Sequence, residues 1–283
     1  MTTVAVGAAP QKSSNFYLGF LFLSKQRQEA LGAVYGFARV VDDIVDGGEF
    51  SDEEAAKELD FWDQEVERLF EGKQEHPITI AIEPHVKRFN LPEEGFVELV
   101  KGVRMDLEKS RYETFEDLEQ YTFGVAGAVG LLCVEIFGYK KTSAEDIRAY
   151  ALAMGNAFQL TNILRDVGED LERGRIYLPL ADLKEAGCSE EMIISRRHTP
   201  EFKSLMNREY QRAKEFYREA RSRLHPDDRV SMTSAEVMAH VYEALLDQIK
   251  EEDFRVQFQR VRVPTWRKLI LAVKAWLYCR GVF

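Results

Sequence analysis

The sequence predicts an all-α protein built as a single domain. Apolar residues recur at spacings of three and four along nearly the whole chain, and the period-two alternation of half-buried strands is almost absent. The 283 residues are 45% hydrophobic, with only 8 prolines and no linker rich in Ser, Gly or Pro. A chain of this size can bury one large core. We therefore assign residues 1–283 to one domain, and we expect residues 1–11 to be flexible.

Short local signals mark where the helices should begin. Ser51, Thr114 and Ser143 each precede acidic residues, as expected for an N-cap followed by a first turn that favours negative charge. Pro77 and Pro92 are expected at first helical positions. Helix ends read from a sequence are uncertain by about 2–4 residues. The expected helices are 13–46, 52–71, 76–89, 93–109, 115–137, 144–170, 201–223, 230–254 and 265–279.

Two glycine-containing segments receive different interpretations. Residues 174–179, which read Gly-Arg-Ile-Tyr-Leu-Pro, break the helical pattern and predict a loop. Residues 124–130 are rich in Gly and Ala but lack the preceding strand and the lysine of a phosphate-binding loop. We expect this second run to be a helix that can approach a neighbouring helix or a hydrocarbon chain closely, because glycine has no Cβ.

Composition and charge exclude several classes of protein. The net charge of −10 argues against nucleic-acid binding, which needs a basic face. Three distant cysteines, Cys133, Cys188 and Cys279, favour neither disulfides nor zinc and fit a reducing compartment, the cytoplasm. The N-terminus lacks the features of a signal peptide. No stretch approaches about 20 uninterrupted apolar residues, so no membrane-spanning helix is expected.

Two expected helices are apolar on nearly every side and then run into aspartates. Residues 33–41 lead into Asp42 and Asp46, and residues 150–164 lead into Asp166 and Asp170. Helices that are apolar all round lie inside a protein. Residues four apart share a helix face, so each helix should carry a polar stripe that ends in paired carboxylates. The stripes consist of Tyr35, Arg39, Asp42 and Asp46, and of Gln159, Asn162, Asp166 and Asp170.

These carboxylate pairs point to magnesium and a diphosphate. A single Asp-x-x-x-Asp is more often a solvated helix end, but here the pattern occurs twice, and no Lys or Arg follows four residues after Asp42 or Asp46. A buried pair needs more counter-charge than the one arginine beside it supplies. Mg²⁺ binds one or two carboxylates together with phosphate oxygens, and Mn²⁺ could replace it. Nothing marks a nucleotide or NADPH site.

Four segments together resemble the squalene/phytoene synthase family. They are Ser13-Ser-Asn-Phe-Tyr17, Arg39-Val-Val-Asp-Asp-Ile-Val-Asp46, Tyr121-x-x-x-Val-Ala-Gly127 and Gln159-x-x-Asn-Ile-Leu-Arg-Asp-Val-x-Glu-Asp170. The resemblance covers roughly residues 12–262. It implies an isoprenoid synthase fold, a helical bundle around a central cavity. Two prenyl diphosphates would be joined head to head there: one ionises to an allylic cation, and the double bond of the other attacks it to give a cyclopropylcarbinyl diphosphate.

The resemblance also implies roles for individual residues. Asp42, Asp46, Asp166 and Asp170, with Asn162, would hold Mg²⁺, while Tyr121 and Arg39 would complete the catalytic group. For Arg39 an ordinary ion pair with Asp42 is an equal alternative, and core packing is the alternative for the tyrosines. Arg173, Arg175 and Tyr177 would form part of a flap. The expected substrate-binding residues are Ser14, Phe16, Phe20, Tyr35, Gln159, Asn162, Arg165, Tyr177, Tyr242 and Arg260.

Substrate length rests on one aromatic residue of the expected first helix. Phe16, Phe20 and Leu23 share a face of that helix. Phytoene synthases tend to have a small residue at the position of Phe20, whereas C30-forming relatives tend to have a large one. Gly32 points the other way, because a position that is often bulky is empty. An intruding ring blocks a prenyl tail, so we expect two farnesyl (C15) diphosphates and presqualene diphosphate as first product. Phytoene synthesis from two geranylgeranyl (C20) diphosphates is the alternative.

The C-terminal segment stands apart from the acidic background. Residues 254–283 contain seven basic residues and no acid. Residues 264–283 predict a basic amphipathic helix with an apolar stripe of Trp266, Leu269, Ile270, Val273, Trp276 and Leu277. Such a helix suits peripheral contact with the inner face of a membrane, and core packing is an equal alternative.

Two further functions compete with condensation. A class I terpene cyclase would also place magnesium-binding carboxylates on helices but would use a single prenyl diphosphate. A non-catalytic relative acting as an assembly factor would typically lack the aspartates, and all four are present.

Overall fold

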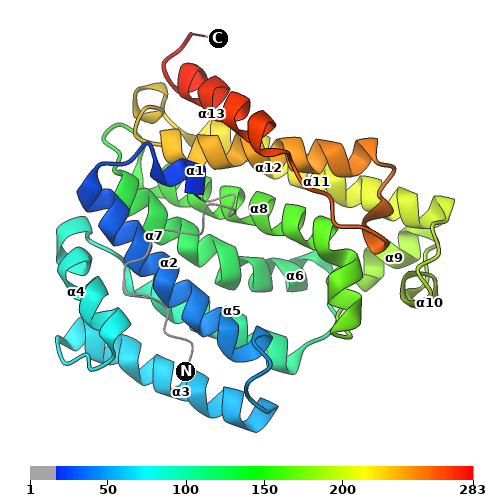
Figure 1. Ribbon diagram of the computed structural model, residues 1–283, viewed down its shortest axis with the longest axis horizontal. Helices are drawn as coiled ribbons and strands as arrows, with labels where there is room; N and C mark the ends of the chain where they lie inside the picture. The colour runs from blue at the N-terminus through cyan, green and yellow to red at the C-terminus, as the bar shows by residue number, and fades with distance from the viewer. Residues whose placement is uncertain (1–16, 283) are drawn as a thin grey trace.

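The computed structural model of the chain describes residues 17–282, and within that range every regular element is a helix (Figure 1). This confirms the all-α prediction. The α-helices are α1 (Tyr17–Phe20), α2 (Lys25–Asp46), α3 (Asp52–Glu71), α4 (Pro77–Phe89), α5 (Glu93–Glu108), α6 (Phe115–Thr122), α7 (Ala128–Phe137), α8 (Ala144–Glu172), α9 (Leu180–Ala186), α10 (Glu190–Ile194), α11 (Pro200–Arg223), α12 (Thr233–Glu251) and α13 (Thr265–Cys279). A π-helix, η1 (Phe123–Gly127), joins α6 to α7, and short 3₁₀ helices lie at η2 (Pro226–Asp228) and η3 (Arg255–Gln257).

The long helix α8 lies at the centre of the bundle. It packs against α11 and α12 on one side and against η1 and α7 on another, while α2 and α5 border the same interior space (Figure 1). Its apolar middle is buried as expected, with Leu160 and Leu164 almost fully enclosed. One continuous cluster of buried side chains extends from Phe20 to Val263, so the described chain forms a single domain around one core.

The first helix is broken, contrary to the prediction of one helix over residues 13–46. Within the described residues α1 ends at Phe20, and α2 begins at Lys25 after a turn. The side chain of Gln28 closes this turn by donating to the carbonyl oxygens of Phe20 and Leu23, at 2.8 and 3.2 Å. No Gly or Pro interrupts residues 20–24, and the local signal near the break is Ser24, which is the N-cap of α2.

The π-helix η1 and two close contacts at glycines shape the cavity wall formed by residues 115–137. A Cβ on Gly102 of α5 would lie 2.7 Å from the backbone of Gly124, and a Cβ on Gly155 of α8 would lie 2.7 Å from that of Gly127. The predicted close helix approach is therefore confirmed. The segment Phe115–Phe137 is long and apolar enough to cross a membrane, but 56% of its most apolar window is buried inside the bundle, as in a core helix.

The predicted helix starts hold at four positions, including Pro77 as the first residue of α4, and shift by one residue at a fifth. Ser51 and Thr114 form capping boxes with Glu54 and Asp117, and Ser143 accepts from the backbone N–H of Asp146. Pro92 is the N-cap of α5 rather than its first helical residue. The loop at residues 174–179 is confirmed. Helices α9 and α10 were not predicted, because five to seven residues are too few to show a helical period.

Candidate active site

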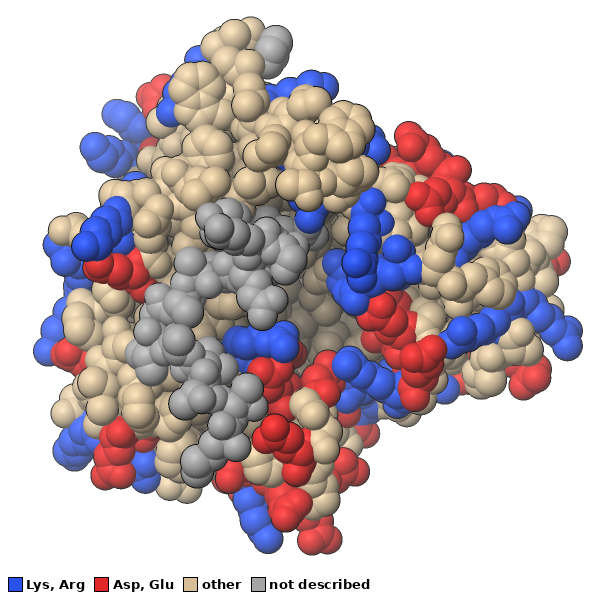
Figure 2. All heavy atoms as spheres, viewed as in Figure 1, with Lys and Arg blue, Asp and Glu red and all other residues tan. Residues whose placement is uncertain are grey.

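A cavity of about 570 Å³ opens between the two predicted apolar helices. Its walls come from α2, α5, η1, α7, α8 and α12, with the 173–177 loop at one side. Figure 2 shows the hollow near the middle of one face, bordered by basic and acidic side chains. Its volume lies in the usual range for small-molecule sites. The lining has a charged region and an apolar region, which suits an amphiphilic ligand.

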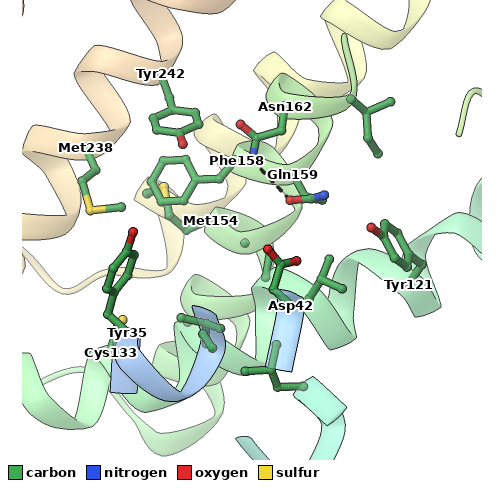
Figure 3. Close-up of a pocket in the computed structure, with 18 of the residues that line it drawn as sticks. Tyr35, Asp42, Tyr121, Cys133, Met154, Phe158, Gln159, Asn162, Met238 and Tyr242 are labelled. Atoms are coloured by element: carbon green, nitrogen blue, oxygen red, sulfur yellow. Dashed lines mark hydrogen bonds between the residues drawn. The ribbon is translucent and has the colours of Figure 1, made fainter. Parts of the chain in front are cut away.

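The apolar region is reached by following three helices away from the charged residues. Along α2 the lining passes from Asp42 through Tyr35 to Leu31, and along α8 it passes from Asp166 through Phe158 to Tyr150. Along α12 the lining passes from Tyr242 through Met238 to Ala235. Figure 3 shows Met154, Phe158, Met238 and Tyr242 around this chamber, with Cys133 and Tyr35 opposite. The rings of Phe158 and Tyr242 lie 4.9 Å apart.

Phe20 is part of the apolar lining of the cavity. It lines the cavity, and only 5% of it is exposed. The neighbouring carbonyl of Gly19 accepts a 2.9 Å hydrogen bond from Ser234 at the start of α12, and Gln28 donates to the Phe20 carbonyl. The backbone of Phe20 is therefore held on both sides. Gly32 is buried but is not among the described lining residues, nor is Leu23, which lies in the turn.

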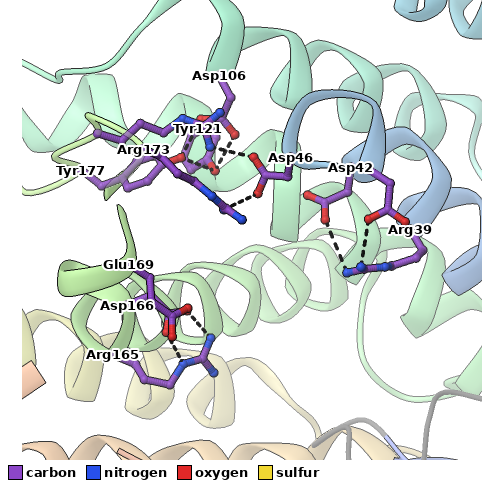
Figure 4. Close-up of polar contacts among 12 residues, drawn as sticks. Arg39, Asp42, Asp46, Asp106, Tyr121, Arg165, Asp166, Glu169, Arg173 and Tyr177 are labelled. Carbon is purple, nitrogen blue, oxygen red and sulfur yellow. Dashed lines mark hydrogen bonds and ion pairs between the residues drawn. The ribbon is translucent and has the colours of Figure 1, made fainter. Parts of the chain in front are cut away.

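On the α2 side, the predicted stripe faces the cavity at its C-terminal end. Asp42 and Asp46 both line the cavity (Figure 4). Arg39 lies 3.8 Å from Asp42 but only 2.9 Å from Asp43, so its ion pairs are within its own helix. The ion-pair alternative for Arg39 is thus what the structure contains, and its guanidinium, which is half exposed, still lies at the cavity edge.

On the α8 side, acids and arginines alternate around the cavity edge. Arg165 forks onto its neighbour Asp166, with Nε to Oδ1 at 2.7 Å. Arg260, which follows η3, approaches Asp166 at 3.4 Å and binds both oxygens of Glu169 at 2.9 and 3.0 Å. Figure 4 shows Asp166 on the opposite side of the cavity from Asp42 and Asp46. The two aspartate motifs therefore face each other, as the sequence predicted.

The loop after α8 supplies counter-charge that the sequence analysis underestimated. Arg173 and Arg175 each donate a 2.8 Å hydrogen bond to Asp46, one to each oxygen. We expected each carboxylate pair to have only one nearby arginine, and this was wrong. Among the described lining residues, six acids accompany five arginines. The loop arginines come from a different segment of sequence, so spacing along α2 could not reveal them.

Two carboxyl groups still hold their protons unusually tightly. Half of the Asp42 side chain is open to the cavity, yet its enclosure by the cavity walls, followed by repulsion from Asp46, raises its pKa to about 6. Burial and then repulsion from Asp166 raise the pKa of Asp170 to about 7. Each motif thus contains one acid that binds arginine, Asp46 or Asp166. The other acid of each motif, Asp42 or Asp170, has a raised pKa.

The donor set fits a divalent cation bound together with phosphate. Among the described residues, no group of three or more acidic, His or Cys side chains converges closely enough to hold a metal alone. Mg²⁺, however, is commonly bound by one or two carboxylates plus substrate phosphates. Asn162 lines the cavity between the motifs, and its buried Oδ1 has no hydrogen-bond partner within residues 17–282. A bound cation would favour the ionised forms of Asp42 and Asp170 and would so lower their raised pKa values.

A half-buried acid on α5 and two buried tyrosines complete the site, and no sequence pattern predicted the acid. Asp106 on α5 accepts hydrogen bonds from Tyr177 at 2.7 Å and from Tyr121 at 3.0 Å. The two phenol rings stack with centroids 5.0 Å apart. Burial raises the pKa of Asp106, and burial and then Asp106 raise the pKa of Tyr121 well above its usual value. Both phenols therefore stay protonated and donate to Asp106.

The structure gathers the described candidate residues into this one cavity. Ser14 and Phe16, like Ser13, lie outside the described residues. The candidate residues that the sequence predicted thus lie together in one cavity. Their roles in binding and catalysis stay predictions. The residues that line the cavity are Asp42, Asp46, Asp166, Asp170, Tyr121, Arg39, Phe20, Tyr35, Gln159, Asn162, Arg165, Tyr177, Tyr242 and Arg260.

Comparison with known proteins gives a consistent result. The family model described as squalene/phytoene synthase matches residues 9–267. The chain is 35% identical to a phytoene synthase of Arthrospira platensis, over 95% of this chain and 90% of the relative. It is 38% identical to a chloroplastic phytoene synthase of Narcissus pseudonarcissus, over 91% of this chain. The chain spans only about three fifths of that plant protein (61%).

Solved structures are similar over most of their length. A dehydrosqualene synthase in complex with a ligand superposes with a TM-score of 0.82 and 28% identity, covering 95% of this chain and 93% of the other. The squalene synthase HpnC of Alicyclobacillus acidocaldarius gives a TM-score of 0.77 and 32% identity, covering 85% and 89%. The helical arrangement around the cavity is thus shared with both proteins.

Proposed function

The chain belongs to the squalene/phytoene synthase family, and from that premise we propose that it condenses two farnesyl diphosphates head to head. The products are presqualene diphosphate, one inorganic diphosphate and one proton. The observation that carries the proposal is the form of the cavity. Two acidic helix ends face each other across its charged region, and its apolar lining includes the ring of Phe20.

The charged region suits departure of a diphosphate. Arg165, Arg173 and Arg175 lie where phosphate oxygens would compete with aspartates for their N–H groups, and Arg forks match phosphate geometry. Asp42, Asp46, Asp166, Asp170 and Asn162 would hold Mg²⁺, which supplies Lewis-acid stabilisation of the leaving oxygens when it is bound. Substrate binding would release some arginines from their present carboxylate partners.

The remaining residues would control the cation. Loss of diphosphate from one substrate leaves an allylic cation, and the double bond of the second substrate attacks it, closing a cyclopropane with loss of a proton. Tyr121, Tyr177, Phe158 and Tyr242 offer π faces beside the chamber, and such faces stabilise positive charge. The apolar walls exclude water, which would otherwise capture the cation as an alcohol.

Phe20 supports the C15 preference. Its ring lines the cavity, and the carbonyls of Gly19 and Phe20 accept hydrogen bonds from Ser234 and Gln28, which hold the backbone of this short helix in place. A geranylgeranyl chain has one more isoprene unit, and five carbons without space lose several times about 0.8 kcal/mol of burial. Gly32, the residue that favoured C20, does not line the cavity.

Phytoene synthesis is a second candidate, because the relatives at 35–38% identity are named phytoene synthases. Competition between farnesyl and geranylgeranyl diphosphate, with Mg²⁺ and product analysis, separates the two. We expect kcat/KM to favour the C15 substrate, and Phe20→Ala to admit the C20 substrate. Phe22→Ala is the matched control, because Phe22 is partly exposed and is not among the described lining residues. A wild-type preference for C20 would overturn the C15 assignment.

The other two functions receive no support from a specific observation. A terpene cyclase would convert one substrate molecule, and an assembly factor would release no diphosphate. Neither is favoured by the match to this family or by the phytoene, dehydrosqualene and squalene synthases that resemble the chain.

A further inference from the structure

Helix α13 packs against the rest of the protein through its small residues and leaves its large apolar residues exposed. Ala272, Ala275 and Cys279 are buried, and the first two pack against Val237 of α12 and Leu18 of α1. The predicted stripe points the other way. Trp266, Leu269, Ile270, Val273 and Trp276 are between 37% and 65% exposed. We call these five residues the α13 face. Five of the six predicted stripe residues are therefore not packed in the core, whereas the sixth, Leu277, is half-buried.

An apolar face of this kind needs a partner. Single exposed apolar residues are ordinary, but five on one face of a helix form a contiguous patch, which usually marks an interaction site. The helix is too short to cross a bilayer, because 15 residues span about 22 Å. It can, however, lie flat at an interface with its apolar side in the lipid.

The charges around the α13 face select the kind of partner. Within residues 17–282, Arg262, Arg267, Lys268 and Lys274 form no ion pair with an acid. Arg280 stacks on Trp276, with its guanidinium carbon 3.9 Å from the ring centroid. These cations are unpaired although the chain carries a net charge of −10. An anionic surface would complement them, whereas a second copy of the same face would bring like charges together.

The α13 face also lies on the same side of the molecule as the cavity. Figure 2 shows an uncharged region over α13 directly above the hollow, with basic side chains between them. Arg260, which lines the charged region of the cavity, precedes the first residue of α13 by only five positions. The start of α13 is therefore close to the charged region of the cavity.

We propose that the α13 face docks on an anionic lipid membrane, with α13 parallel to the surface and the cavity opening toward the lipid. The five apolar side chains would enter the headgroup boundary, and the unpaired cations would contact lipid phosphates. This orientation lets an amphiphile leave the bilayer and enter the cavity without crossing bulk water. The inference does not depend on which prenyl diphosphate is used.

The test is sedimentation of the full chain with vesicles of phosphatidylcholine alone or mixed with phosphatidylglycerol, at low and high salt. We expect binding only to the mixed vesicles, and weaker binding at high salt. Trp266→Ser with Ile270→Ser should weaken binding at least tenfold. Ile80→Ser with Ile194→Ser is the matched control, because both residues are about as exposed as Ile270 but lie on α4 and α10. Unchanged melting curves would show that each variant folds.

Three outcomes would overturn the proposal. One is equal vesicle binding by the wild type and the Trp266/Ile270 variant. Another is no binding by the wild type at low salt. The third is a wild-type dimer in sedimentation velocity that the same variant abolishes, which would assign the face to a second copy. Condensing activity on detergent-dispersed substrate should be unchanged in the variant, so failure here is distinguishable from failure of the proposed function.

Discussion

Asp42 and Asp46 share one helix face but have different electrostatic surroundings. Two loop arginines bind the oxygens of Asp46, while enclosure and repulsion raise the pKa of Asp42 to about 6. The same division recurs on α8, where Arg165 binds Asp166 and the pKa of Asp170 is about 7. Folding alone does not favour an ionised Asp42 or Asp170, which supports a role in binding a cation.

Replacing Asp42 should separate activity from stability. We predict that Asp42→Asn lowers kcat by about 10² or more, because charge that stabilises the leaving group is lost. The melting temperature without metal should stay equal or rise, because repulsion with Asp46 is relieved. Asp43→Asn is the matched control, since Asp43 is adjacent but does not line the cavity. Similar activity losses in both variants would remove the special role of Asp42.

The raised pKa values also predict a pH dependence. Asp42 and Asp170 bind protons more tightly when folded than at their ordinary value of 3.8, so their contribution to stability is complete below about pH 4. It is lost as the pH rises through 6 to 7. We predict that metal-free melting temperatures fall over this window and that Mg²⁺ affinity rises over it.

The Asp170→Asn variant tests this pH dependence. It should flatten the decline in melting temperature without removing it, because buried Glu209 also has a pKa of about 7 and contributes in both proteins. A slope identical to that of the wild type would contradict the assignment, as would Mg²⁺ binding that does not vary between pH 5.5 and pH 7.5.

Tyr177 and Tyr112 form a matched pair for testing the Asp106 cluster. Tyr177 donates to Asp106 and lines the cavity, whereas the buried hydroxyl of Tyr112 has no hydrogen-bond partner in the described part of the chain. We predict that Tyr177→Phe lowers stability by about 1 kcal/mol and reduces kcat more than it changes KM. Tyr112→Phe should be neutral or stabilising. Equal effects of the two substitutions on kcat would argue against a role for the cluster in the reaction.

At the scale of elements, strong apolar periodicity predicted the helices well, but it did not predict the local breaks within them. The ends of α3, α8 and α13 lie within two residues of prediction, because caps and apolar stripes coincide there. The break after α1 escaped prediction, since the contacts that fix it come from Gln28 and from Ser234 on a distant helix. The π-helix η1 was not predicted for a similar reason. Its position depends on where α5 and α8 press against η1, which single-sequence periodicity does not record.

The crossing of α5 and η1 leads to a prediction about glycine. Gly102→Ala should destabilise the fold by about 1–3 kcal/mol, because the new Cβ would lie 2.7 Å from the Gly124 backbone and force the helices apart. Gly36→Ala in α2 is the control: a Cβ there would have no atom within 4 Å, so helix propensity should add up to about 1 kcal/mol. Denaturant unfolding measures both changes. A neutral Gly102→Ala would show that this contact can relax.

At the scale of the whole molecule, the sequence located the site better than it described its balance of charge. The two aspartate motifs were recognisable because each lies on an apolar helix and spaces its carboxylates by four. Asp106 lies on an ordinary amphipathic helix, so nothing in its sequence neighbourhood marks it as the hydrogen-bond partner of two phenols. Arg173 and Arg175 were expected only as part of a flap, with no carboxylate partner assigned to them. Only the folded chain brings them to Asp46.

The central claim is that two prenyl diphosphates are joined in one cavity, and the number of diphosphates released tests it most directly. With farnesyl diphosphate as the only substrate and Mg²⁺ present, inorganic diphosphate and C30 product are measured as substrate is consumed. We predict one diphosphate for every two farnesyl diphosphates, a C30 diphosphate as product, and no release when the metal is chelated. One diphosphate for each substrate molecule, with only C15 products, would contradict it.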